Sequence, residues 1–191
     1  NGGAIFVGNM TGTAAAQALT GKGITSLSGP GFINSGTISA GGTEIITSGG
    51  TGQNTTVHGA QYVSAGGLSI SDTVNSAGVQ NLLSGATANQ TTVGSGGTTI
   101  ASSGAHINSI TVAGGTVNNG GILNGAVVQT GKLEVTSGGT ASGVTVQSGG
   151  TEITDAGGYS LNVIISSGGT AIVQSGGYAS GGTINKGGIE V

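Results

Sequence analysis

Four glutamates are the residues of this sequence best suited to acid–base chemistry. Glu44, Glu134, Glu152 and Glu190 each lie six residues after an aliphatic residue of an internal repeat. Glu134 and Glu152 belong to successive repeats, so they could form a two-carboxylate hydrolase centre, whose groups stand about 5–5.5 Å apart in retaining glycosidases. Stacked repeats place every repeated position about 4.8 Å from the next, so this spacing says little. Alternation along a strand instead predicts that these glutamates face outward as a solvated column.

The other reactive side chains give no catalytic or metal-binding pattern. His58 and His106 occupy different repeat positions, and neither has an acidic residue close in sequence to orient it for a triad. The absence of cysteine excludes thiolate chemistry and disulfides. Three lysines and no arginine cannot neutralise a run of phosphates, which argues against a nucleic-acid partner. We therefore expect no catalytic residue, no cofactor and no metal.

An internal repeat must position these side chains. Short runs rich in Thr, Val and Ile alternate with Gly pairs, often within the tetrad Ser-Gly-Gly-Thr. The last apolar residue of each run serves as an anchor, and most successive anchors are 19 residues apart. The anchors are Ile38, Val57, Val74, Val93, Val112, Val128, Val146, Ile165 and Ile184.

A second apolar position follows most anchors by seven residues, and we expect it to form a second buried column. Val63 and Leu82 fill this position one residue early and one residue late. The remaining members are Ile45, Ile100, Val135, Ile153, Ile172 and Val191.

This pattern predicts an all-β fold, a right-handed, single-stranded parallel β-helix (β-solenoid) with about 19 residues per turn. Runs of β-branched residues form strands, and glycine supplies the positive φ that sharp corners need. One repeat buries too few aliphatic side chains to fold alone, so the repeats must stack. The 44 glycines exclude a helical bundle, and a single proline excludes collagen. A β-sandwich and a β-propeller agree less well with one unit of this length.

The chain divides into two parts by this criterion. Residues 1–36 do not keep the period, and we predict irregular N-terminal turns or a cap there, with residues 13–20 able to form one or two helical turns. Residues 37–191 form the β-solenoid repeat array, which stops within a unit and so suggests a longer array or stacking on another copy. No run of 18 apolar residues is present, so no transmembrane helix is expected in this fragment.

The repeat resembles that of the AIDA-type autotransporter passengers, a self-associating adhesin family of Gram-negative bacteria. Residues 146–153 (Val-Gln-Ser-Gly-Gly-Thr-Glu-Ile) and 165–172 (Ile-Ser-Ser-Gly-Gly-Thr-Ala-Ile) carry the resemblance, which covers about residues 37–191. It implies a surface-exposed or secreted bacterial protein that mediates cell adhesion, self-association and biofilm formation, with an unknown receptor.

The same resemblance implies O-glycosylation, because in many members a dedicated heptosyltransferase modifies Ser or Thr of the repeats. The candidate glycan acceptors of this chain are its corner serines. They are Ser48, Ser95, Ser137, Ser148, Ser167, Ser175 and Ser180.

Four functions remain open at this point. The leading one is a non-enzymatic adhesive rod that associates with identical chains through its polar faces. The second is a self-stacking extracellular filament subunit, joined end to end. A polysaccharide-active β-helix enzyme is the third, and a chain that serves chiefly as a glycosyltransferase acceptor is the fourth.

Overall fold

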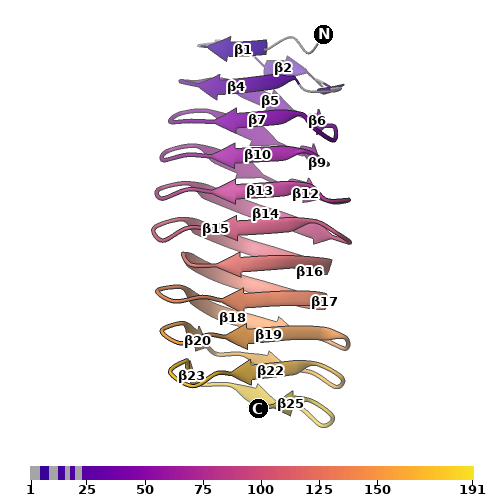
Figure 1. Cartoon of the computed structure of the whole chain (residues 1–191), viewed down its shortest axis with the longest axis vertical. Coiled ribbons are helices and arrows are strands. Elements are labelled where there is room, and N and C mark those ends of the chain that lie inside the picture. Colours follow the sequence, from indigo (N-terminus) through magenta and orange to yellow (C-terminus); the bar gives the residue numbers. More distant parts are fainter. Residues whose placement is uncertain (1–4, 9–12, 16–17, 20–22) are drawn as a thin grey trace.

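The computed structural model describes residues 5–8, 13–15, 18–19 and 23–191, and every element in them is a β-strand. The strands form a right-handed solenoid of about nine turns with about 19 residues per turn (Figure 1). Each strand pairs in parallel with its equivalents in neighbouring turns, as in β7 with β10. The predicted fold class is therefore confirmed.

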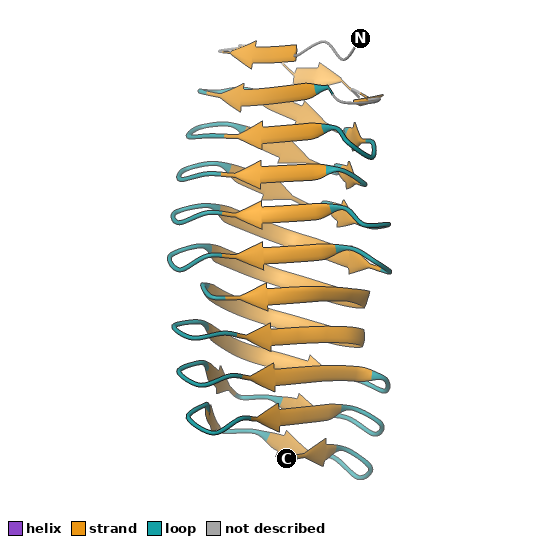
Figure 2. Ribbon diagram, in the orientation of Figure 1, coloured by secondary structure: helices purple, strands orange, loops and turns teal. Residues whose placement is uncertain are grey.

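The rod has three strand columns joined by three corners (Figure 2). The front column consists of β1 (Ile5–Gly8), β4 (Ile24–Ser28), β7 (Thr43–Ile46), β10 (Ala60–Val63), β13 (Val79–Leu82), β15 (Thr98–Ala101), β19 (Gly150–Thr154), β22 (Thr170–Val173) and β25 (Ile189–Glu190). The second column consists of β2 (Thr13–Ala15), β5 (Phe32–Asn34), β8 (Thr51–Gln53), β11 (Leu68–Ile70), β20 (Tyr159–Leu161) and β23 (Tyr178–Ser180). The third consists of β3 (Ala18–Leu19), β6 (Thr37–Ile38), β9 (Thr56–Val57), β12 (Thr73–Val74), β21 (Ile164–Ile165) and β24 (Thr183–Ile184).

Four longer strands pass through corners and contribute to more than one column. They are β14 (Thr87–Gly94), β16 (His106–Asn119), β17 (Ile122–Val135) and β18 (Thr140–Val146). We call the corner between the third and front columns corner A, the corner between the front and second columns corner B, and the corner between the second and third columns corner C.

The nine predicted anchors form one continuous column in the third strand column. Each anchor is the register partner of the next, from Ile38 with Val57 to Ile165 with Ile184. The side chains from Ile38 to Ile165 are buried, whereas Ile184 in the last described turn is half exposed. Stacked aliphatic side chains thus fill the interior along the whole array, as predicted.

The predicted second column was wrong by one residue in most turns. Ile45, Ile153 and Ile172 are only partly buried, and Ile100 is largely exposed. The interior positions are the residues on either side, such as Glu44 and Ile46 in β7. The count of seven from the anchor spans corner A, so it does not reveal the face on which alternation resumes. Val135 and the offset members Val63 and Leu82 are buried, whereas Val191 is exposed.

Corner C turns on a single residue in the left-handed conformation. Its φ lies between 51° and 75° in every turn of residues 35–181, although only three of the nine residues are glycine. Asn and Ser tolerate this region better than most side chains because they bond locally to the backbone. These residues are Ser35, Asn54, Ser71, Gln90, Ser109, Gly125, Gly143, Asn162 and Gly181.

The described strands within residues 1–36 also stack in the solenoid. Thr25 pairs with Glu44, and Phe32 pairs with Thr51. The helical turns expected in residues 13–20 are wrong where the chain is described, because β2 and β3 are strands paired with β5 and β6. Residues 16, 17 and 20 lie outside the described residues. The domain boundary at residue 36 and a cap role for residues 1–36 stay predictions.

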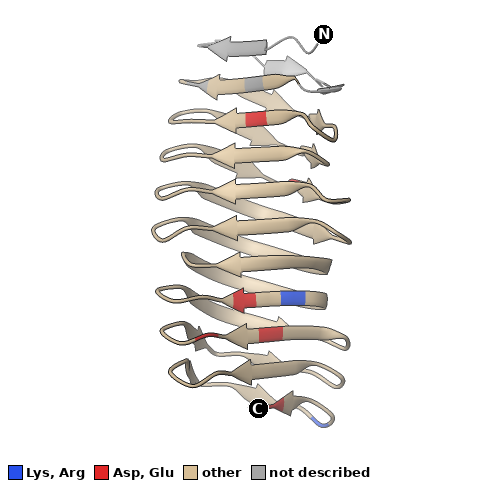
Figure 3. Cartoon of the chain, viewed as in Figure 1, with Lys and Arg blue, Asp and Glu red and all other residues tan. Residues whose placement is uncertain are grey.

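The surface of the rod carries few charges, and most rungs in Figure 3 show none. Outward columns consist mainly of Thr, Ser and Asn, as in the register partners Asn89 and Asn108 of β14 and β16. In the described ranges, no helix is long and apolar enough to cross a bilayer.

The interior column predicts a sharp contrast between two adjacent leucines. Leu82 is fully buried and Leu83 is 42% exposed. Replacing Leu82 with Ala removes core contacts and leaves a cavity, so we expect a loss of about 2–5 kcal/mol in the free energy of unfolding. Leu83→Ala is the matched control and should change it by less than about 0.5 kcal/mol. Urea denaturation followed by circular dichroism checks both, and equal losses would contradict the assigned interior face.

Candidate functional site

The seven predicted acceptor serines are all exposed, but they lie at three different corners. Ser95, Ser148 and Ser167 are at corner A. Ser48, Ser137 and Ser175 are at corner B. Ser180 ends strand β23 next to the left-handed Gly181 of corner C, so its tetrad differs structurally from the others.

Two glycines shape each serine turn at corners A and B for different reasons. The first has a positive φ, for example +77° at Gly168, which strains any residue with a Cβ. The second lies against main chain of the preceding turn: a Cβ on Gly150 would collide with the carbonyl oxygen of Val128. Tight stacking therefore favours glycine at both positions of the Ser-Gly-Gly pattern.

At Ser48, Ser137, Ser148 and Ser167 the hydroxyl points along the rod toward the next turn. A Cβ built on Gly168 would lie 2.6 Å from Ser148 Oγ, and one on Gly187 would lie 2.7 Å from Ser167 Oγ. The absence of these Cβ atoms leaves the hydroxyls accessible from solvent. The array thus presents small, uncharged hydroxyl groups at fixed positions.

Main-chain hydrogen bonds hold these turns in register. Gly149 N–H donates to Gly168 O at 3.0 Å, and Gly168 N–H donates to Gly187 O at 2.8 Å. At corner B, Gly138 N–H donates to Gly157 O at 2.9 Å. Consecutive hydroxyls are therefore separated by about one rung, about 4.8 Å.

The sequence motif missed two equivalent serines. Ser84 and Ser103 are exposed turn residues of corner B, each followed by a glycine with positive φ. Their second glycine is replaced by Ala86 or Ala105, so the Ser-Gly-Gly-Thr tetrad does not match. Their place between the end of a front-column strand and a glycine was the available signal.

The expected outward column of glutamates is wrong for three of its four members, because Glu190 also continues the inner column: its register partner Ala171 is buried and pairs with Glu152. Glu44 and Glu152 are buried, each 1% exposed. Glu134 is partly exposed on the outer face, and its register partner is Ile153, whereas Glu152 pairs with Leu133. Corner A is one residue shorter before Leu133 than before Glu152, which shifts the phase. Glu134 and Glu152 thus point to opposite sides of the sheet and do not form a carboxylate pair.

Glu44 belongs to a buried polar cluster centred on Gln61. Gln61 Nε2 donates to Glu44 Oε2 and to Asp72 Oδ2, both at 2.7 Å. Asp72 also accepts from Ser69 Oγ at 2.7 Å and from Thr55 N–H at 2.8 Å. Since the two carboxyl groups share one amide donor, ionising both would leave adjacent negative charges inside the rod.

Burial raises the pKa of both carboxyl groups in this cluster. The pKa of Glu44 rises to about 7, first because burial removes water and also because Asp72 is close, while the Gln61 hydrogen bond opposes the shift. The pKa of Asp72 rises to about 6 from the same loss of water, opposed by the hydrogen bonds from Gln61, Ser69 and Thr55. Gln80 extends this set of buried hydrogen bonds into a ladder along the rod, since its Nε2 donates to Gln61 Oε1 at 2.8 Å.

A third buried acid lies farther along the rod. Ser160 Oγ donates to Glu152 Oε1 at 2.9 Å, and Thr154 Oγ1 lies 2.8 Å from the same serine oxygen. Glu152 Oε2 has no hydrogen-bonding partner in the described chain. Burial raises the pKa of Glu152 to about 7, and the Glu190 carboxylate adds to the shift.

The remaining polar groups do not assemble into a reactive centre. His58 lies at corner A and His106 on the outer face of β16, in separate columns as expected. The described ranges contain no cluster of three or more His, Asp or Glu side chains that could hold a metal ion. Lys132 Nζ pairs with Glu134 Oε2 at 2.6 Å on the surface, where such a pair contributes little.

Comparison with known proteins gives a match among solved structures. No protein-family model and no curated protein sequence matches the chain. Among solved structures, it matches the crystal structure of the TibC-catalysed, hyper-glycosylated fragment 55–350 of TibA. The TM-score is 0.95 at 30% sequence identity, over 98% of this chain and 70% of the TibA fragment.

The buried acids predict that the protein is more stable in mild acid than above neutral pH. A carboxyl whose pKa is raised from 4.5 to about 7 on folding binds more protons in the folded state between these values. Its stabilising contribution is therefore complete below about pH 4.5 and is lost as the pH rises through 7.

Glu152→Gln removes one such group, so we expect the decline in unfolding free energy from about pH 4.5 to pH 8 to shrink by about 1–3 kcal/mol. Thr151→Ser, on the outer face beside Glu152, is the control and should leave the decline unchanged because it alters no titratable group. Chemical denaturation at several pH values measures this decline in the unfolding free energy. A Glu152→Gln profile as steep as that of the wild type would show that Glu152 is already ionised in the fold.

Proposed function

We propose that this chain, which belongs to the AIDA-type autotransporter passengers, is a non-enzymatic adhesin passenger. It would act outside the cell, on the bacterial surface or after secretion, in cell adhesion, self-association and biofilm formation. The single observation that carries the proposal is the full-length match of its solenoid to the TibA fragment.

The exposed corner serines support a role as glycan acceptors. Ser148 and Ser167 illustrate the geometry, with an accessible hydroxyl on a rigid turn beside a glycine. A glycosyltransferase of the heptose-adding kind is the partner we propose for them. The TibA fragment was solved in a form hyper-glycosylated by TibC, which supports the proposal by analogy. Ser84 and Ser103 share the corner and the exposure, so we include them.

Self-association would use the polar outer faces of the rod. Five threonines of the third column stack in register on its outer side: Thr37, Thr56, Thr73, Thr92 and Thr111. Side-by-side contact would form many hydrogen bonds, each contributing about 1 kcal/mol or less, which repetition sums. The low charge of the chain offers little repulsion to such contact.

The carboxylate geometry favours a non-enzymatic role. A hydrolase centre needs two carboxyl groups that face the same substrate. Glu134 is on the outer face and Glu152 in the interior, so a sugar chain cannot reach both.

The glycosylation proposal predicts specific mass additions. Co-expression with a heptosyltransferase of this family should add several heptose units, detectable by intact-mass spectrometry. Replacing the seven predicted serines with Ala should remove most of the added mass, and Ser84→Ala with Ser103→Ala should remove a further part. Ser160→Ala, at a buried serine, is the matched control and should remove none. No added mass, or full modification of the nine-serine variant, would refute the acceptor assignment.

The association proposal predicts weak dependence on salt. The average sedimentation coefficient of the purified protein should change less than about twofold between about 0.05 and 0.5 M NaCl, because hydrogen bonds rather than ion pairs join the rods. Thr73→Lys with Thr92→Lys introduces repulsion on the threonine ladder and should weaken association several-fold at low salt. Thr73→Ser with Thr92→Ser keeps the hydroxyls and should not. Electron microscopy separates lateral bundles from the end-to-end filaments that are the alternative.

A further inference from the structure

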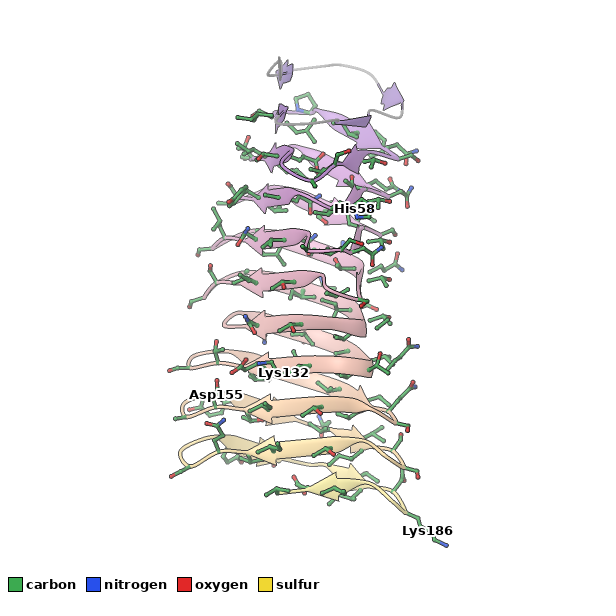
Figure 4. The ribbon with its side chains drawn as sticks, turned by 45° about the vertical axis from the view of Figure 1, so that its right-hand side comes forward. His58, Lys132, Asp155 and Lys186 are labelled. Atoms are coloured by element: carbon green, nitrogen blue, oxygen red, sulfur yellow. The ribbon has the colours of Figure 1, made fainter. Side chains whose placement is uncertain are left out.

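One corner of the rod lacks a turn that its neighbours have. Four residues join β6 to β7 and four join β12 to β13, but only His58 and Gly59 join β9 to β10. The strands on both sides keep their register, since Val57 pairs with Ile38 and Val74, and Ala60 pairs with Thr43 and Val79. The two missing residues therefore leave a notch at corner A, and Figure 4 labels His58 there.

The notch is an open hollow of about 380 Å³ between two protruding turns. Residues 40–42 form one lip and residues 76 and 77 form the other, two rungs or roughly 10 Å apart. His58, Gly59 and Ala60 line it between the lips. A hollow of this size is within the range of small-molecule sites, about 300–1,000 Å³.

The two lips offer opposite hydrogen-bonding groups. Where full turns are consecutive, the N–H groups of one turn donate to the carbonyls of the next, as Ala77 N–H does to Gly96 O at 2.9 Å. Within the described chain, the Gly41 N–H donates to no protein acceptor and the Ala77 carbonyl accepts from no protein donor. The missing turn thus leaves donors on one lip and acceptors on the other.

The lip at residues 76 and 77 also has an unusual backbone. Ser76 and Ala77 have φ of 51° and 68°, two successive left-handed residues without glycine. Comparable turns in the described chain have one left-handed glycine, such as Gly149 or Gly168. Such conformations cost free energy and are concentrated at ligand-binding positions.

The lining of the notch suits an uncharged ligand. It contains no Asp, Glu, Lys or Arg. The His58 imidazole, which has no hydrogen-bonding partner in the described chain, offers one donor and one acceptor. Ala40, Ala60, Ala77 and Val79 add an apolar surface.

We propose that this notch binds a neutral sugar unit in place of the missing turn. Each sugar hydroxyl is both a donor and an acceptor, so one ring can accept from the Gly41 lip and donate to the Ala77 lip. The C–H face of the ring then packs on the alanines, and His58 bonds a further hydroxyl. The binding does not depend on the adhesin proposal.

A second short corner differs and serves as an internal comparison. Only Gly120 and Gly121 join β16 to β17 at corner B. At the left edge of Figure 2, this bend extends less far than the loops above and below it. There the Thr136 hydroxyl lies 3.2 Å from the place of a Cβ on Gly120, so a side chain reaches over the gap. Neither of the two joining residues is a histidine, and His106 lies one rung away as the register partner of Ile122.

The test is an NMR titration of the ¹⁵N-labelled, unglycosylated chain with mannose, galactose, N-acetylglucosamine and a heptose. At least one sugar should shift the amides of residues 40, 41, 58, 76 and 77 saturably, while those of residues 103, 104, 137 and 138 stay in place. Inserting Ser-Gly between His58 and Gly59 restores the full turn and should weaken binding at least tenfold. His58→Ala, which keeps the main chain of the notch, should weaken it several-fold.

Three results would overturn the proposal. They are the absence of saturable shifts with every sugar, equal shifts in the insertion variant, and shifts caused only by the blocked peptide Ser-Gly-Gly-Thr. The source of the sugar is decided by adding unlabelled chain with and without its glycans. Shifts with only the glycosylated chain identify a second copy as the donor, and shifts with free sugar alone identify a diffusible ligand.

Discussion

Parallel main-chain pairing between successive turns is the interaction on which the rest of this structure depends. A strand of two residues, such as β9, cannot persist alone, yet it pairs in register with β6 and β12 and encloses a buried anchor. The same pairing continues through the corners, where the turn at Gly149 bonds to the turn at Gly168. Because every turn must keep this register, a residue added or lost in the sequence has to be absorbed at a corner. The corners are therefore where the rod varies and where its candidate sites lie.

Close stacking also explains the glycine content. A rung spacing of about 4.8 Å brings the second glycine of each turn against main chain of the preceding turn, where a Cβ on Gly97 would collide with the carbonyl oxygen of Val74. Corner C accepts Asn, Ser and Gln because it has only to reach a left-handed φ, without a close contact of that kind. The two requirements are distinct: the Ser-Gly-Gly motif recurs at corners A and B, where both apply, whereas at corner C it occurs at Ser180.

The sequence was sufficient to predict the fold class, the period and all nine anchors, because the β-branched anchor column and the Gly pairs are imposed by the stacking itself. It was insufficient for the second interior column. The phase of alternation in the front column depends on the length of corner A, which differs between Val57, Val128 and Val146 by one or two residues, and a fixed count from the anchor ignores this. The same cause made Glu44 and Glu152 look like surface residues. Ser84 and Ser103 were missed because alanine replaces the second glycine, a change that the stacking tolerates at those turns.

The buried acids show how an interior of this shape accommodates polar groups. A solenoid core is narrow, so each interior side chain contacts chiefly its equivalents one rung away and its neighbours across the lumen. Gln61 can therefore bridge Glu44 on the preceding turn and Asp72 across the core, and Gln80 can continue the ladder. Such contacts need neighbours of matching polarity at the same rung position. Where the column changes from Thr99 to Val117 and Leu133, the ladder stops. Beyond it, Glu152 accepts a hydrogen bond from Ser160, and its other carboxyl oxygen has no partner among the described residues. The narrow, dehydrated core thus raises the pKa of these acids, so that burial favours their protonated forms.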